Sequence, residues 1–214
     1  MWRRIMPNKN SQVLRNEVEE LLLQRRSTRS YKKKLVPEYM IRRILETGRF
    51  APSAGNCQPW RFIVIQNREI IDDMEARLIS LMSKLDKVVH TDGWKRDLAV
   101  ALTGILASTN VGDLRPFGAT REVLDGRLKI FHDAPAVLLI LKDTRGIDSP
   151  DFDTGICSQN MVMAAHSMGL GTCYIGFASF LRKDTEWMKK FKIADPWAIA
   201  TAITIGYSKY KSDG

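Results

Sequence analysis

Apolar and polar residues alternate with different periods along this chain, and the changes of period mark out its secondary structure. Apolar residues recur at helical spacing over residues 16–24, 37–48, 70–82, 151–168 and 185–191, which predicts helices there. Runs of β-branched and aromatic residues predict strands over 60–65, 136–141, 172–175 and 197–205. Because helices and strands do not alternate strictly, the pattern favours an α+β fold over a doubly wound sheet.

The helix predicted over 151–168 is apolar on most faces and carries few charges, so we expect it to be central and buried. Asp151 or Asp153 is placed to cap its start. The pattern weakens over 83–132, which we interpret as a variable cap region. A helix is expected near 97–107, and glycines and a proline predict a loop or mobile cap over 109–130.

The length of 214 residues suits one domain, here 13–214, preceded by a flexible arm over 1–12. With 44% hydrophobic residues, the chain can bury a core without disulfides or a structural metal. Its three cysteines, Cys57, Cys157 and Cys173, are odd in number and widely spaced, which is typical of reduced thiols in a cytoplasmic protein. No signal sequence or membrane span is visible, so we expect no membrane partner.

The net charge of +9 makes nucleic acid a first guess for a partner. However, the basic residues are scattered, apart from short runs such as Lys32-Lys33-Lys34, and no nucleic-acid-binding motif accompanies them. An anionic small ligand such as a flavin or nicotinamide phosphate accounts for part of the bias equally well. We therefore rank a phosphorylated cofactor above DNA or RNA.

Three separate segments carry candidate chemistry. The first contains Arg25, Arg26, Ser27 and Arg29, whose guanidinium and hydroxyl groups can clamp phosphate and carbonyl groups. A basic run of this kind is also typical of an ordinary solvated face.

The second segment, residues 51–60, is a loop of small residues, two prolines and hydrogen-bonding side chains. It suits the edge of a flat heterocycle, although an ordinary helix-to-strand connection has the same composition. The third segment runs from Asp153 to Gly176. The backbone N–H of Gly176, directly after a short strand, could face a ligand, whereas Met161 and Met163 are interpreted as core.

In this order and spacing, the three segments resemble the nitroreductase family of flavoproteins, from about Val18 to Tyr207. The resemblance implies an α+β fold with a central, mostly antiparallel sheet surrounded by helices. It also implies an interlocked homodimer with two FMN sites at the subunit interface. The residues that it assigns to FMN are Arg25, Arg26, Ser27, Arg29, Pro52, Ser53, Ala54, Asn56, Gln58, Ile175, Gly176, Lys209 and Lys211.

Among these residues, the resemblance places Arg25 at the flavin phosphate and Arg29 near the pyrimidine edge. Ser53, Ala54 and Asn56 would come partly from the other subunit, and Ile175 and Gly176 would face flavin N5. The family's Gly-Tyr-Pro after the last strand is replaced here by Gly-Tyr-Ser at 206–208, and Lys209 and Lys211 follow as candidates for the phosphate.

The implied activity is NAD(P)H-driven, ping-pong reduction of nitroaromatics, quinones or similar acceptors. One alternative is a flavin dehydrogenase or dehalogenase on the same fold, with its own physiological substrate. Another is a non-catalytic flavin-binding module. The sequence lacks the GxGxxG fingerprint of a Rossmann site, so a nicotinamide would visit as a substrate. The flavin carries the chemistry, so His90, His132 and His166 need no catalytic role.

Overall fold

The computed structural model of the chain describes residues 15–89 and 115–210. The helices within these residues are α1 (Glu17–Gln24), α2 (Glu38–Arg49), α3 (Arg68–Val89), α5 (Arg115–Leu124), α6 (Pro150–Ser167) and α7 (Thr185–Lys190), with two 3-10 helices, η1 (Ala54–Asn56) and η2 (Gly176–Lys183). The strands are β1 (Trp60–Ile65), β2 (Ala136–Asp143), β3 (Gly171–Ile175) and β4 (Trp197–Gly206). The mixture confirms the α+β class.

The four strands form one sheet in the order β1-β2-β4-β3, and each neighbouring pair is antiparallel. The sheet therefore has β1 at one edge and β3 at the other. An additional parallel bridge joins Ser27 to Thr172 on β3, and an antiparallel bridge joins Tyr31 to Ser208 after β4. These bridges bring the N-terminal basic segment to the β3 edge.

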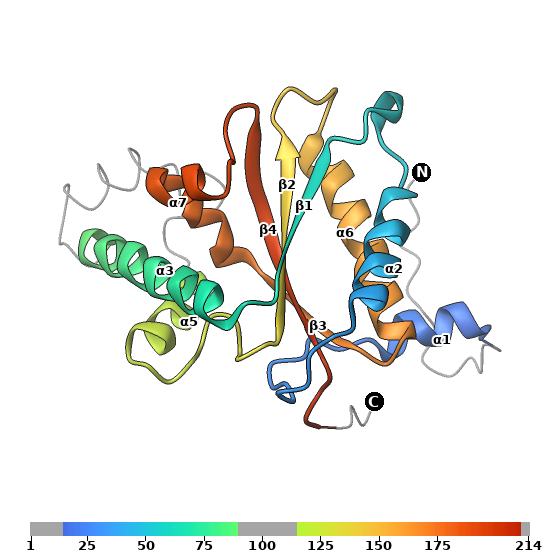
Figure 1. Cartoon of the computed structure of the whole chain (residues 1–214), viewed down its shortest axis with the longest axis horizontal. Coiled ribbons are helices and arrows are strands. Elements are labelled where there is room, and N and C mark those ends of the chain that lie inside the picture. Colours follow the sequence, from blue (N-terminus) through green and yellow to red (C-terminus); the bar gives the residue numbers. More distant parts are fainter. Residues whose placement is uncertain (1–14, 90–114, 211–214) are drawn as a thin grey trace, which may run out of the picture.

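Helices cover both faces of the sheet and create two separate cores (Figure 1). One core contains α2 and α6 against strand residues such as Leu138 and Ile203. The other contains α3, η2 and α7 against residues such as Leu139 and Ala202. Consecutive strand residues point to opposite faces, which explains why both of these cores draw on the same strands.

Most of the predicted elements are confirmed, several with matching bounds. The strand at 60–65 is β1, and the helices predicted at 16–24 and 185–191 are α1 and α7. Asn16 caps α1 in a capping box. The Asn16 side chain accepts from the Glu19 N–H, and the Glu19 carboxylate accepts from the Asn16 N–H. The helix predicted at 70–82 is longer than expected, because α3 continues to Val89.

Two expectations for α6 need correction. Ser149, not Asp151 or Asp153, caps the helix, because Pro150 occupies the first helical position, for which a proline is well suited. The helix is also not buried all round. Cys157, Met161 and similar residues on one face are buried, whereas the opposite face is open to solvent in the single chain.

The loop predicted over 109–130 is wrong for residues 115–124, which form α5. Pro116 lies in the first turn of α5, where a proline favours helix formation rather than breaking it. The helix expected near 97–107 and the arm over 1–12 lie outside the described residues. No helix among the described residues is long and apolar enough to cross a membrane.

Candidate flavin site

The basic segment that follows α1 is an extended stretch fixed to the ends of two strands. The Thr28 N–H donates to the Thr172 carbonyl at 2.8 Å, and the Lys32 N–H donates to the Tyr207 carbonyl at 2.8 Å. The Tyr31 side chain is buried, and its hydroxyl lies 2.7 Å from the Thr28 carbonyl. Residues 27–32 are therefore held as firmly as a strand.

Two glycines permit this close packing. Thr28 lies directly against Gly171, where a Cβ atom would overlap its side chain. Tyr31 and Pro135 lie against Gly206 in the same way. Any larger residue at either glycine would push the basic segment off the sheet.

Alternate residues of the basic segment point to different surroundings, as expected for extended chain. Ser27 and Arg29 lie against the thiol of Cys173 on β3. Arg26 instead lines another cavity, of about 470 Å³, together with Thr28 and Lys32. Its guanidinium also donates to the Leu23 carbonyl at the end of α1. The structure thus separates Arg26 from the other predicted clamp residues.

Arg25 and Arg29 are cations without an anionic partner inside the described part of the chain. Neither makes an ion pair there, whereas Arg42, Arg68 and Arg77 all pair with carboxylates. Unpaired guanidinium groups beside a sheet edge are suited to binding an anionic ligand.

The two arginines also perturb nearby titratable groups. Burial, and then the positive charge of Arg25, lowers the pKa of His166. Burial, and then Arg29, lowers the pKa of His132. Both imidazoles are therefore neutral at pH 7. His90 lies outside the described residues.

The predicted loop from Pro52 to Gln58 contains the short helix η1. Within this loop, Gly55, Asn56 and Gln58 adopt left-handed backbone conformations. The Gln58 N–H donates to the Ser53 hydroxyl at 2.9 Å. Pro52, Asn56 and Gln58 are exposed. The loop thus presents polar groups outward on a constrained backbone.

The η1 loop is anchored to the first turn of α6. The Ala54 N–H donates to a carboxylate oxygen of Asp153 at 3.1 Å. Asp153 is itself buried, so this bond is shielded from water. Asp153 was part of the third motif, and the structure shows that it positions the second.

Ile175 and Gly176 lie where β3 ends and η2 begins. Ile175 is buried in the core, whereas Gly176 is exposed and has no atom within 4 Å of the position that a Cβ would take. The backbone at Gly176 is therefore open to close approach by a flat ring.

The C-terminal part of the third segment lies beside the first segment, whereas its N-terminal part, at Asp153, lies beside the second. Ser27, Arg29 and Ile175 all lie along β3. The η1 loop lies at the other end of α6, beside Asp153. From Asp153 to His166, near the basic segment, α6 rises by about 20 Å. The η1 loop and the Arg25 end of the basic segment therefore lie at opposite ends of α6.

Of the two C-terminal lysines predicted at the phosphate, the structure describes Lys209. The Lys209 N–H donates to the Ser30 carbonyl at 3.1 Å, which is roughly 16 Å of extended chain away from Arg25. The structure does not bring Lys209 to Arg25, so their shared phosphate remains a prediction. Lys211 lies outside the described residues.

Cys173 is a site residue that the sequence reasoning missed. It precedes Ile175 by two positions on β3, so both side chains share one face of the sheet, and Ser27 and Arg29 contact its thiol. Burial raises the pKa of this thiol against the opposing effect of Arg29, so the thiol is neutral. The period-2 alternation before Ile175 was the signal that could have identified it.

Comparison with known proteins identifies the family of this fold. The sequence profile of the nitroreductase family matches residues 22–207. A chloronitrobenzene nitroreductase of Comamonas testosteroni is 27% identical over 202 residues, covering 89% of this chain and 86% of that protein. An NADH dehydrogenase of Thermus thermophilus is 53% identical over 45 residues, covering 21% of this chain and 22% of that protein.

Among solved structures, a nitroreductase with bound FMN from Desulfitobacterium hafniense superposes with a TM-score of 0.70 at 19% identity, covering 92% of each chain. This similarity confirms the fold expected from the resemblance. The chain belongs to the nitroreductase family.

Proposed function

We propose that the protein is an FMN-dependent oxidoreductase that NAD(P)H reduces and that passes electrons to nitroaromatics, quinones or similar acceptors. The proposal is carried by one observation: Arg25 and Arg29, which make no ion pair within the described residues, lie near Cys173 on β3, the strand that ends at the open backbone of Gly176. Family membership and the activities of the relatives support the same reaction class.

The residues at this edge fit FMN. A phosphate and the electron-rich pyrimidine edge of a flavin are the groups that two guanidinium groups along one extended segment can bind. The open space at Gly176 leaves room for the ring. When bound, FMN supplies the redox chemistry, and the chain supplies binding, orientation and charge.

Arg29 has the clearest electrostatic role toward the cofactor. The resemblance places it near the pyrimidine edge, where a reduced flavin carries negative charge. A fixed cation there stabilises the reduced form. Cys173, which contacts Arg29, adds no second charge because its thiol is neutral.

We further propose that the working unit is a homodimer in which the η1 loop of one copy completes the flavin site of the other. The loop lies beside Asp153, at the opposite end of α6 from His166 and the neighbouring Arg25. Exposed apolar residues support a partner. Helix α1 contains no buried residue in the single chain, and its apolar side chains Leu22 and Leu23 are each 51% exposed. An isolated eight-residue helix is unstable without tertiary packing.

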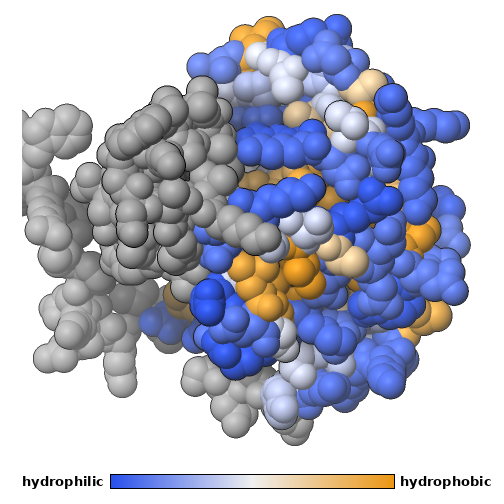
Figure 2. Space-filling model, turned by 90° about the vertical axis from the view of Figure 1, so that its left-hand side faces the viewer, coloured by the Kyte–Doolittle hydropathy of each residue, from blue (hydrophilic) through white to orange (hydrophobic). Residues whose placement is uncertain are grey.

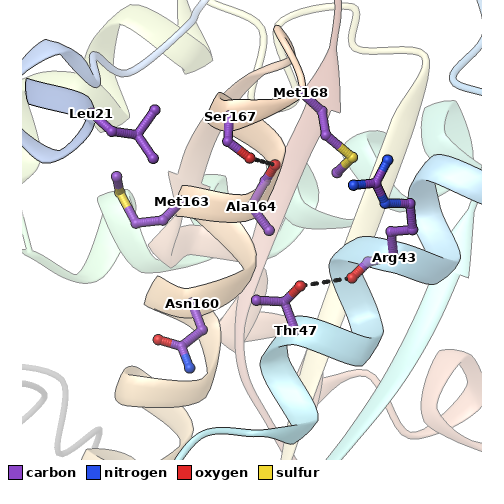
Figure 3. A pocket seen from close by; sticks show the side chains of 8 residues that line it. All are labelled: Leu21, Arg43, Thr47, Asn160, Met163, Ala164, Ser167 and Met168. Carbon is purple, nitrogen blue, oxygen red and sulfur yellow. Dashed lines mark hydrogen bonds between the residues drawn. The ribbon is translucent and has the colours of Figure 1, made fainter. Parts of the chain in front are cut away.

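A cavity of about 420 Å³ lies on this apolar side, between α1, α2 and α6. Leu21 and Met163 point toward the same space, with Arg43 on the far wall (Figure 3). The coloured surface around the α3 and α7 end is mainly hydrophilic, with apolar areas near its centre, at its top and along its right-hand edge (Figure 2). We therefore place the second copy on the α1 and α6 side.

The two substrates should take turns at one flavin face. The family fold provides no separate dinucleotide-binding unit, so reductant and acceptor share a cavity. Parallel double-reciprocal plots are expected, as for other ping-pong schemes. Intersecting plots would contradict a shared cavity.

The first experiment is anaerobic addition of NADH or NADPH to FMN-loaded protein, followed by absorbance. Bleaching of the flavin supports the proposed function, whereas failure of both reductants favours a dehydrogenase or dehalogenase with another reductant. Protein that stays colourless after incubation with excess FMN would refute the flavin assignment. A cytoplasmic location is part of the proposal, and the three free cysteines are consistent with a reducing compartment.

A further inference from the structure

A second cation-rich cavity adjoins the candidate flavin site. It has a volume of about 500 Å³, within the range of small-molecule sites. Its walls come from residues 31–35, the start of α3, the turn over 129–135, and Lys209. The Lys209 N–H bonds to the Ser30 carbonyl, immediately beside Arg29, so the cavity is continuous with the basic segment.

The cavity has an excess of positive charge. Four cations line it, against two carboxylates, Asp72 and Asp133. Arg68 pairs with Asp72, and the Lys129 ammonium lies 2.6 Å from Asp133. The remaining cations, Lys33 and Lys209, make no ion pair within the described ranges.

The floor and frame of the cavity are apolar and rigid. Ile71 and Ala134 are buried beneath it. The turn that forms one wall is fixed because the buried Glu75 carboxylate accepts from the Ile130 N–H at 2.5 Å. The first turn of α3 adds the positive end of a helix dipole.

Three consecutive lysines, unexplained by the flavin site, point to three different places. Lys33 lines this cavity, and Lys32 lines the neighbouring one next to Arg26. The Lys34 ammonium lies 4.6 Å from the centre of the Tyr207 ring. Lys33 and Lys34 therefore differ in placement while sharing charge and sequence context.

We propose that this cavity binds the phosphorylated adenosine end of the dinucleotide reductant, and that the protein consequently prefers NADPH to NADH. The two excess positive charges match a phosphate monoester dianion, and the apolar floor suits a flat base. Proximity to Arg29 would let the nicotinamide end of the same molecule reach the flavin. This inference rests on the proposed function.

The test is calorimetric binding of adenosine 2′,5′-bisphosphate to FMN-loaded protein. The Lys33→Ala variant should bind it about fivefold more weakly, the effect of one partly exposed charge. The Lys34→Ala variant is the matched control and should bind like the wild type. Circular dichroism and a melting curve for both variants confirm that each is folded.

Steady-state kinetics gives a second readout. The ratio of kcat/KM for NADPH to that for NADH should fall in Lys33→Ala, by a similar factor, and stay constant in Lys34→Ala. Equal losses in both variants would indicate a general charge effect and overturn the proposal.

Three further outcomes would also overturn it. These are no binding of the bisphosphate, equally tight binding of inorganic phosphate, and displacement of the bisphosphate by free FMN, which would make the cavity part of the flavin site. If NADH and NADPH reduce the flavin with equal efficiency and Lys33→Ala leaves both rates unchanged, this inference is overturned while the proposed function stands. Failure of both reductants would instead defeat the proposed function.

Discussion

The two segments that carry most of the predicted flavin contacts are held in contrasting ways. Residues 27–32 are fixed by backbone bonds to β3 and to the end of β4, with Tyr31 buried beneath them. The η1 loop is exposed and is joined to α6 by one buried side chain, Asp153. The first segment is thus part of the sheet, whereas the second is an outward-facing loop.

This contrast indicates which half of the site is preformed in one chain. The β3 edge needs no partner to hold its shape, because its hydrogen bonds are internal. The η1 loop presents exposed polar groups at the other end of α6 from Arg25, about 20 Å away along the helix. The difference is what a site shared between two copies requires.

The largest expected effect is on the sheet-bound half. Arg25→Glu should weaken FMN binding about 100-fold, because it replaces a charge-assisted bond to phosphate with repulsion. Quenching of FMN fluorescence on titration measures the affinity. Arg26→Glu is the control, since Arg26 lines another cavity and should change the affinity little. Equal losses of FMN affinity in the two variants would show that Arg25 and Arg26 do not point to different surroundings.

The anchor of the loop comes next. Asp153→Ala removes a buried bond and should lower the free energy of unfolding by about 2 kcal/mol. Chemical denaturation measures this change. Asp151→Ala is the control, because Asp151 is exposed and, within the described ranges, pairs only with Lys142, so the cost should stay within about 0.5 kcal/mol. An unchanged free energy of unfolding in Asp153→Ala would mean that Asp153 does not anchor the loop.

Arg29→Ala should shift the flavin itself rather than the fold. Loss of a cation near the pyrimidine edge should lower the reduction potential by about 30 mV, equivalent to about 1.4 kcal/mol for a two-electron couple. Spectroelectrochemical titration gives the potential. An unchanged potential with normal FMN binding would remove Arg29 from the site.

The smallest effect concerns the packing under the basic segment. Tyr31→Phe deletes a hydroxyl that lies 2.8 Å from Thr204 Oγ1, and should cost about 1 kcal/mol of stability. Burial raises the pKa of Tyr31, so the hydroxyl stays protonated throughout the usual pH range. Tyr39→Phe, at an exposed position, should be neutral. Thermal unfolding separates the two variants.

The sequence predicted the elements that have strong local signals. Trp60–Ile65 is dense in β-branched and aromatic residues, and its bounds are confirmed. By contrast, Ser149 caps α6 and Pro150 is its first residue, whereas the nearby aspartates had been predicted as the cap. Pro116 was interpreted as a loop signal, although a proline in a first turn also starts helices.

The candidate site was predicted as a set of residues but not as an arrangement. Nothing local in the sequence shows that Arg26 and Arg29 point to different surroundings, because alternation appears only once Ser27 pairs with β3. The contact between Cys173 and Arg29 likewise depends on pairing between segments about 145 residues apart. Such long-range contacts are set by tertiary packing.

Subunit complementation tests the central claim, that each flavin site combines the basic segment of one copy with the η1 loop of the other. One variant, Arg25→Glu, damages the segment, and a second, Asn56→Trp, damages the loop. Neither should bind FMN well alone. When the two are mixed under conditions that exchange subunits, each heterodimer should regain one intact site, which is about one quarter of all sites at random pairing. Flavin binding restored to that level is the predicted result, and no restoration in confirmed heterodimers would contradict the shared site.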